Sequence, residues 1–301
     1  MTTISKKALS LFLVLLVLVC PLLAAAEGAP VRVTDMKGRE IALSEPATRI
    51  VATAASDCEI LYAIGAGDLL VGRGEYCDYP EAVQSVPSVE SGSETNLEQL
   101  LALSPQIVIM NTMAQTLDQV QALENAGVRV VASEATDIAG VYQAIELLGA
   151  LTGKTDEAAQ VVQGMKDVFA SVTVAPTDEP KTVYFEVSPL EYGLWTAGTG
   201  TFMDELAQMM GLRNCFDDVS GWAEVSEEQV LTRNPDYIVT ISMDYGTGLT
   251  PTEEIMARAG WQSVKAVENH AILNLQNNEL SRPAPRLAEG AKQLFDFVYG
   301  E

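Results

Sequence analysis

Hydrophobic and polar positions along this chain alternate with the two periods that strands and helices impose. Predicted strands fall at 49–54, 128–132, 182–187 and 271–275, and predicted helices at 57–64, 117–125, 201–210 and 252–259. Glycine follows several of these helices, as expected where a helix ends in a left-handed turn. Strands that alternate with helices favour parallel sheets. The pattern therefore predicts an α/β protein.

A short motif recurs at a constant offset of 130 residues. The matched pairs are Asn96 and Ser226, Glu98 and Glu228, Gln99 and Gln229, Leu101 and Leu231, Pro105 and Pro235, Val108 and Ile238, and Ile109 and Val239. In each copy the first residue can cap a helix, and the glutamine three residues later can complete a capping box. The proline then ends the helix before a strand. The repeat predicts two lobes built on one plan.

Residues 155–172 separate the two copies and contain few helix breakers. Their apolar residues are spaced as on one face of a long amphipathic helix. We therefore expect two parallel-sheet α/β lobes joined by a long interlobe helix. The expected divisions are a signal peptide at 1–26, an N-terminal lobe at 27–154, a linking helix at 155–175 and a C-terminal lobe at 176–301.

The first 26 residues have the form of an export signal. Lys6 and Lys7 precede a long apolar run that ends in three alanines before Glu27. Cleavage after Ala26 is the first expectation, with lipidation of Cys20 or an uncleaved membrane anchor as the alternatives. The protein is expected to cross the cytoplasmic membrane and to act in the periplasm or at the cell surface.

Composition narrows the range of partners. Removing residues 1–26 leaves 16 Lys and Arg against 41 Asp and Glu, a net charge of −25. Nucleic acid is excluded as a partner because its phosphates need a basic surface. Solubility outside the cell accounts for most of this acidity. Of the cysteines left, Cys58 and Cys77 could form a disulfide after export, whereas Cys215 is expected to be buried and inert.

Catalytic and metal-binding patterns are scarce. The single histidine, His270, precedes an apolar strand, and the sequence has no nucleophile elbow, phosphate-binding loop or dinucleotide fingerprint. One histidine cannot build a usual transition-metal site. We therefore predict no catalytic residues, no bound cofactor and no bare metal. A ligand that carries its own chelated metal fits better.

Ligands of open α/β sheets bind beyond the carboxyl ends of the strands. That rule, together with two tryptophans in glycine-containing loops, selects the candidate ligand-binding residues Ser56, Tyr76, Asn111, Met113, Trp195, Trp222, Tyr245 and Arg282. Aromatic and amide groups predominate, which suits a large, partly flat ligand. Two alternatives stay open: Trp195 and Trp222 could pack in the core, and Arg282 could form a salt bridge instead of binding an anionic group.

Several segments resemble the iron-siderophore and cobalamin binding proteins of ABC importers, the class whose lobes are joined by a long helix. In the first lobe they are 49–51, 59–65 (EILYAIG), 76–80 (YCDYP), 96–98 and 105–108, and in the second 197–202 (AGTGTF), 226–231 (SEEQVL) and 282–287 (RPAPRL). They occur in order over nearly the whole exported chain. One departure concerns the ligand, because Asn111 stands where cobalamin binders tend to carry a tryptophan.

The resemblance implies rigid lobes, a cleft that closes modestly and delivery of the ligand to membrane permease subunits. The expected ligand is a metal chelate: a ferric siderophore, a corrinoid or haem. The resemblance also implies one acidic docking residue on each lobe, which here would be Glu98 and Glu228. An ordinary solvated helix face is the alternative for both. An exported enzyme and a surface-anchored scaffold are the competing functions.

Overall fold

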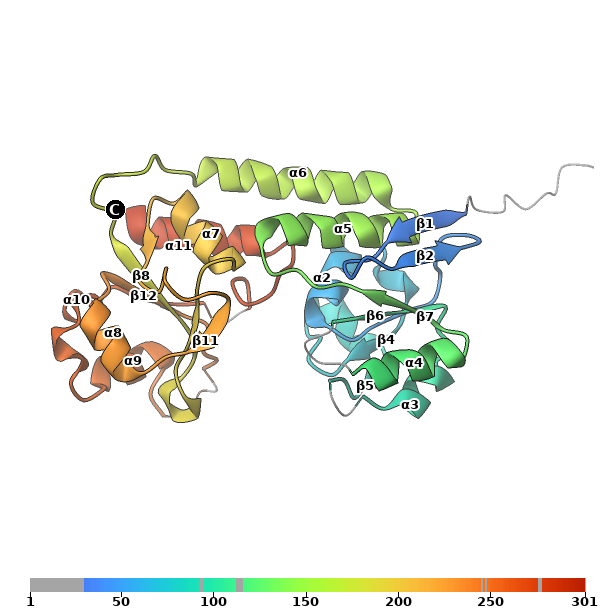
Figure 1. The fold of residues 1–301 in the computed structure, drawn as a ribbon, viewed down its shortest axis with the longest axis horizontal. Coiled ribbons are helices and arrows are strands. Elements are labelled where there is room, and N and C mark those ends of the chain that lie inside the picture. The colour runs from blue at the N-terminus through green and yellow to red at the C-terminus, as the bar shows by residue number, and fades with distance from the viewer. Residues whose placement is uncertain are drawn as a thin grey trace, which may run out of the picture.

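The computed structural model describes residues 30–92, 95–111, 116–244, 246, 248–275 and 278–300. Met113, Tyr245, Cys20 and the predicted signal segment lie outside these residues. The described chain forms two α/β lobes, with the earlier residues in one and the later residues in the other (Figure 1).

The N-terminal lobe contains a two-stranded antiparallel hairpin and a five-stranded parallel sheet. The hairpin is formed by β1 (Val31–Thr34) and β2 (Glu40–Leu43). The sheet order is β5 (Ser88–Val89), β4 (Leu70–Gly74), β3 (Ile50–Ala52), β6 (Ile107–Met110) and β7 (Arg129–Ala132). The helices are α2 (Ala55–Ala63), α3 (Leu97–Ala102), α4 (Leu117–Asn125) and α5 (Ile138–Thr152).

The side chains of β6 point alternately to the two faces of the sheet, and this explains the layers of the lobe. Ile107 and Ile109 belong to the hydrophobic cluster that includes α2 and α5, whereas Val108 and Met110 belong to a second cluster with α3 and α4. Successive side chains of a strand point to opposite faces, so a strand covered on both faces is apolar throughout. Helices therefore cover both faces of the sheet.

The C-terminal lobe repeats the plan with additions. Its sheet order is β11 (Trp222–Glu224), β9 (Trp195–Ala197), β8 (Thr182–Ser188), β12 (Tyr237–Thr240) and β13 (Ile272–Asn274), and β10 (Arg213–Asn214) also pairs with β8. Its helices are α7 (Phe202–Met209), α8 (Glu227–Arg233), α9 (Pro251–Ala257), α10 (Lys265–Glu268) and α11 (Leu287–Tyr299). Strand β9 is antiparallel to both neighbours. The predicted pair of α/β lobes with parallel sheets is confirmed, and β9 adds antiparallel pairing at this edge.

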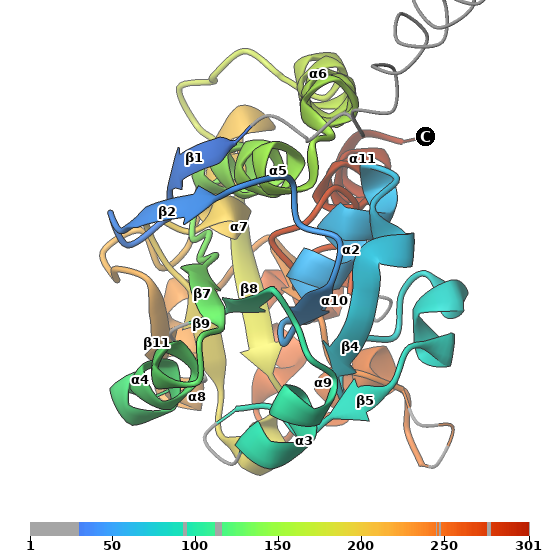
Figure 2. The same cartoon turned by 90° about the vertical axis from the view of Figure 1, so that its right-hand side faces the viewer.

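The long helix predicted between the repeats is α6 (Thr155–Ser171). It lies along one side of the molecule, over α5 and α11 (Figures 1 and 2). Its buried residues are Ala158, Val162, Met165 and Phe169, which recur at the spacing of one helix face. One hydrophobic cluster includes side chains of α5, α6, α7 and α11, so the two lobes share a continuous core.

The repeat at offset 130 is structural. Asn96 caps α3 and Ser226 caps α8, each by accepting a hydrogen bond from the glutamine three residues later. Ser226 and Gln229 complete a capping box. The box predicted for the first copy is not formed, because the Asn96 N–H donates to the carbonyl oxygen of Glu90 instead of to the Gln99 side chain. The Gln99 amide in turn donates to the carbonyl oxygen of Ser88 in the edge strand β5.

Candidate functional site

The carboxyl ends of the parallel strands in the two lobes meet across an interlobe cavity. Its volume is about 520 Å³, and Asp78 and Tyr79, which follow β4, line it from the N-terminal lobe. Met243 after β12 and Glu279 after β13 line it from the C-terminal lobe. This is the position at which open α/β sheets bind ligands. The cavity is therefore the candidate binding cleft.

A second cavity continues the cleft over the C-terminal lobe. It has a volume of about 480 Å³ and shares Met243 with the first. Loop residues after β8 line it, among them Glu191 and Tyr192, together with Glu254 of α9. Tyr192 and the nearby Trp195 are 75% and 40% exposed. Large aromatic surfaces left open to solvent at a cleft are suited to ligand contact.

The floor of this second cavity is held by a buried ion pair. Arg258 donates to both carboxylate oxygens of Glu186, at 2.7 and 2.9 Å, and also binds Glu254. Burial raises the pKa of Glu186, while the hydrogen bonds from Arg258 act in the opposite direction. Because Glu186 lies in β8 and Arg258 directly follows α9, the pair fixes the two elements that shape the floor.

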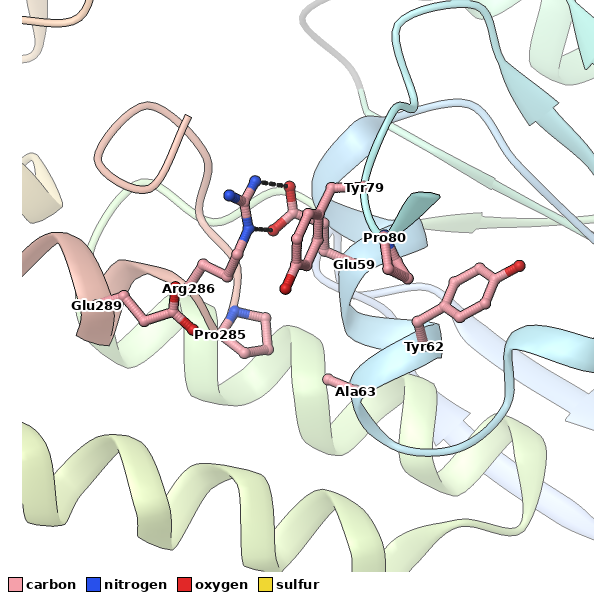
Figure 3. Close-up of a pocket in the computed structure, with 8 residues that line it drawn as sticks. All are labelled: Glu59, Tyr62, Ala63, Tyr79, Pro80, Pro285, Arg286 and Glu289. Carbon is pink, nitrogen blue, oxygen red and sulfur yellow. Dashed lines mark hydrogen bonds and ion pairs between the residues drawn. The ribbon is translucent and has the colours of Figure 1, made fainter. Parts of the chain in front are cut away.

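The lobes are also tied to each other by a charge cluster. Glu59 of α2 accepts hydrogen bonds from Arg282 at 2.9 Å and from Arg286 at 2.9 and 2.8 Å. Asp78 binds Arg282 as well, and the ring of Tyr79 lies over the Arg286 guanidinium, with 3.8 Å from its carbon to the ring centroid. Figure 3 shows Glu59 and Arg286 facing each other beside Tyr79. We call these five residues the interlobe ion cluster.

The cluster is largely withdrawn from solvent. The side chains of Glu59, Arg286 and Arg282 are 2%, 9% and 14% exposed. Burial alone would lower the pKa of Arg282, but its hydrogen bonds to Asp78 and Glu59 raise it above its ordinary value. Paired charges at low exposure depend strongly on one another. The cluster should therefore keep the lobes in a fixed relation.

Other interlobe hydrogen bonds involve α7 and the start of α5. The backbone N–H of Phe202 donates to the carbonyl oxygen of Thr136 at 2.9 Å. The Glu205 carboxylate accepts from the N–H of Ile138 at 2.7 Å, at the amino end of α5, where a negative charge is favourable. Together with the shared core under α6, these contacts support rigid lobes.

The structure distributes the predicted ligand-binding residues unevenly. Tyr76 is 74% exposed beside the interlobe cavity, and its carbonyl oxygen accepts from Arg282. Ser56 is half-buried in the first turn of α2. Asn111 instead lines a separate cavity of about 350 Å³ beside the β1–β2 hairpin. Met113 and Tyr245 lie outside the described residues, so their predicted roles stay predictions.

For Trp222 and Arg282 the contacts agree with the alternatives to ligand binding, which were core packing for Trp222 and a salt bridge for Arg282. Trp222 packs edge-on against Phe202, with ring centroids 5.6 Å apart. Arg282 is engaged by two carboxylates and a carbonyl oxygen. Packing is thus sufficient for Trp222 and a salt bridge for Arg282. Trp195, in contrast, stays available to a ligand.

Sequence reasoning missed Glu59 and Arg286, although it offered a salt bridge as one role for Arg282. The available signal was a carboxylate inside the apolar segment from Cys58 to Leu61, all of which is buried. A charge in such a run requires a partner. That partner lies more than two hundred residues further along the chain, and no local pattern points to it.

The cysteines predicted to pair are neighbours. Cys58 and Cys77 are both buried and are free thiols in this structure. The adjacent Cys77 thiol and burial raise the pKa of Cys58. The disulfide itself stays a prediction. Each cysteine directly precedes a carboxylate of the interlobe ion cluster, so a bond would fix Glu59 and Asp78 relative to each other.

A buried carboxyl group on α2, that of Asp57, predicts an unusual pH dependence of the protein's stability. Burial raises the pKa of Asp57 to about 7, with a hydrogen bond from Ser133 acting in the opposite direction. Because the native pKa exceeds the unfolded value, the native state holds more protons than the unfolded state between about pH 4 and pH 7, and stability falls as pH rises through that window.

Replacing Asp57 with Asn should remove much of this loss. From pH 5 to pH 7 we expect the wild type to lose about 1–3 kcal/mol of unfolding free energy relative to the variant. Urea unfolding at the two pH values measures the difference. Asp68→Asn, on the surface before β4, serves as the control and should keep the wild-type pH dependence. An equal pH dependence in wild type and Asp57→Asn would contradict the assignment.

Comparison with known proteins identifies the architecture. Residues 50–279 match the family described as periplasmic binding protein. The chain belongs to this family. A Bacillus subtilis protein named as an uncharacterized ABC transporter substrate-binding lipoprotein is 30% identical over 277 residues, covering 90% of this chain and 86% of the relative. The family resemblance seen in the sequence is thereby confirmed, and the protein is a solute-binding protein.

The names of two further relatives refer to a ligand. A vitamin B12-binding protein of Salmonella paratyphi A is 27% identical over 252 residues, covering 82% of this chain and 89% of its own. The solved structure of a possible iron-binding protein of Staphylococcus epidermidis is 29% identical, with a TM-score of 0.69, and covers 85% of this chain and 100% of its own.

In the part of our chain that the structure describes, every helix is too short or too polar to cross a bilayer.

Proposed function

We propose that this solute-binding protein captures a ferric siderophore or a related metal complex outside the cytoplasmic membrane and delivers it to ABC permease subunits. The observation that carries the proposal is the cleft between the carboxyl edges of two tied α/β lobes, which Tyr192 lines, with Tyr76 and Trp195 exposed at neighbouring strand ends. Relatives named for vitamin B12 and for iron support a metal-complex ligand. Cobalamin and haem are the alternatives within the same class.

The single histidine supports a complex over a bare ion. His270 lies two residues before β13, at the end of that strand opposite the cleft. A chelated metal brings its own ligands and needs mainly stacking and polar contacts from the protein. No protein side chain then has to coordinate the metal. The proposal assigns no catalytic step to the chain.

Docking to the permease is proposed through Glu98 and Glu228. Each is exposed, and each is the second residue of its helix, α3 or α8. Both helices lie on the side of the molecule away from α6 (Figures 1 and 2). Exposed carboxylates at helix amino ends are well placed to meet arginines of a partner. The neighbouring Glu227 is different, because its carboxylate accepts from the indole N–H of Trp261 at 2.8 Å.

Titration of Trp195 fluorescence tests the binding function. Ferric hydroxamate siderophores, cyanocobalamin and haemin are added in turn to the exported chain, and we expect saturable quenching by one of these classes. Trp195→Phe should lose most of that signal. Trp261→Phe is the matched control and should keep it, because Trp261 is fully buried beside Arg258. Absence of saturable binding by every class would refute the proposal.

A further inference from the structure

Long stretches of the loops that form the binding cleft contain no basic residue, and the exceptions after β13 are Arg282 and Arg286. In both lobes the parallel strands end at the cleft, and the sequence from Gly74 to Val128 contains no Lys, Arg or His. The same holds for 133–153 after β7, for 188–212 after β8, for 241–257 after β12 and for 275–281 after β13. This is a property of the sequence, so it holds for every residue within these ranges.

Carboxylates are frequent at the same strand ends. The exposed ones are Glu75, Asp78, Glu90, Glu191, Glu224 and Asp244. Glu224 lies directly opposite Trp195 in the β9–β11 pair, so their side chains share one face of the sheet. Charges of one sign that line a cleft with low-dielectric walls focus the field and raise the local concentration of the opposite ion.

Basic side chains at the margin of the cleft are already engaged. Arg282 binds Asp78 and shares Glu59 with Arg286, and Arg258 binds Glu186 and Glu254. Each of these arginines is therefore already paired with at least one carboxylate. An anionic ligand group would have to displace a carboxylate from a largely buried pair, which is costly.

Two further basic groups approach the cleft from the N-terminal lobe. Lys37 of the β1–β2 hairpin forms an ion pair with Glu134. Arg73 near the end of β4 donates to the carbonyl oxygens of Gly74 and Glu75. Neither group reverses the negative charge that the exposed carboxylates give to the cleft.

Aromatic rings provide an independent second observation. Tyr76, Tyr192 and Trp195 are 74%, 75% and 40% exposed at the same strand ends. The face of an aromatic ring attracts cations, Trp most strongly. Exposed rings beside carboxylates form an environment for an organic cation with an apolar framework.

We infer that the cleft selects a metal complex of net positive charge and discriminates against complexes of net negative charge. The inference rests on the proposed function and narrows its ligand class. Ferric trihydroxamates with a pendant ammonium group meet this requirement. Ferric catecholates and haem, which carries two propionates, do not.

A charge series on one ligand core tests the inference. Ferrioxamine B carries a protonated amine, its N-acetyl derivative is neutral, and its N-succinyl derivative carries a carboxylate. Fluorescence titration of the exported chain at low salt should give the affinity order cation, neutral, anion, with at least about a tenfold span between the ends. The span should shrink as salt is raised. Equal or tighter binding of the anionic derivative would overturn the inference.

Variants of the cleft locate the effect. Glu191→Gln combined with Glu224→Gln should reduce the ratio between cation and anion several-fold while the neutral derivative changes little. Glu146→Gln on α5 is the matched control, since Glu146 is an exposed helical glutamate away from the cleft loops. An unchanged ratio in the double variant would show that the cleft carboxylates do not set the preference.

A second class of ligand, the corrinoids, distinguishes a failure of this inference from a failure of the proposed function. Cyanocobalamin is neutral overall, and hydrolysis of one side-chain amide gives an anionic derivative of nearly equal size. If the corrinoids bind and the ferrioxamines do not, the neutral corrinoid should bind more tightly than its acid. Tight binding of the acid, of haemin or of a ferric catecholate would overturn the inference and leave the proposed function intact. No binding by any complex overturns both.

Discussion

Replacing Glu59 with Ala should destabilise the protein by about 3–5 kcal/mol, because Arg282 and Arg286 would be left largely buried without their shared carboxylate. Urea unfolding monitored by far-UV circular dichroism measures the change. We also expect looser coupling between the lobes, since Glu59 and the two arginines belong to different lobes. Small-angle scattering should detect that change in the folded variant.

The control for this prediction lies in the same region. Glu289 of α11 lines the cavity drawn in Figure 3 but is exposed. Glu289→Ala should therefore change the unfolding free energy by no more than about 0.5 kcal/mol. If the Glu59 variant were as stable as the Glu289 variant, the interlobe ion cluster would not hold the lobes together.

Replacing Glu98 and Glu228 together with Ala should lower ligand uptake by cells at least about tenfold while the affinity of the isolated protein for the ligand stays at its wild-type value. The physical reason is the separation of the two surfaces. Both glutamates are exposed at the amino ends of α3 and α8 and belong to neither cleft cavity. Uptake of the radiolabelled ligand and titration of the purified variant measure the two quantities.

Glu146→Ala is the matched control for docking, because it removes an exposed helical glutamate on α5, beside α6. It should leave both uptake and affinity unchanged. A loss of affinity in the double variant would place Glu98 or Glu228 at the ligand. Normal uptake with normal affinity would exclude the docking role.

Local sequence patterns predicted most elements of the fold. The helix expected at 155–172 is found as α6, Thr155–Ser171, because one apolar stripe faces a core and polar residues face solvent. Helix α5 had no such signal. Its buried residues include the consecutive Leu147, Leu148 and Gly149, which point in directions about 100° apart around the helix. A helix packed on several sides has weak periodicity.

The site was predictable only in part, because some of its contacts join segments that are distant in the sequence. The rule on strand ends selected Tyr76 and Trp195, which are exposed just after β4 and at the start of β9, because it depends on topology and topology follows from the pattern. Their contact with a ligand stays a prediction. The pairing of Glu59 with Arg286 depends on how two distant segments pack. Asn111 also follows a strand, but the adjacent hairpin and α4 enclose it in a different cavity.

Native mass spectrometry with metal analysis of the protein isolated from its source cells, grown under metal limitation, tests the central claim most directly. We predict one bound solute per chain that contains iron or cobalt in a preformed complex and can be released intact by unfolding. A bound solute without metal, or a bare metal ion held by protein side chains, would contradict the account.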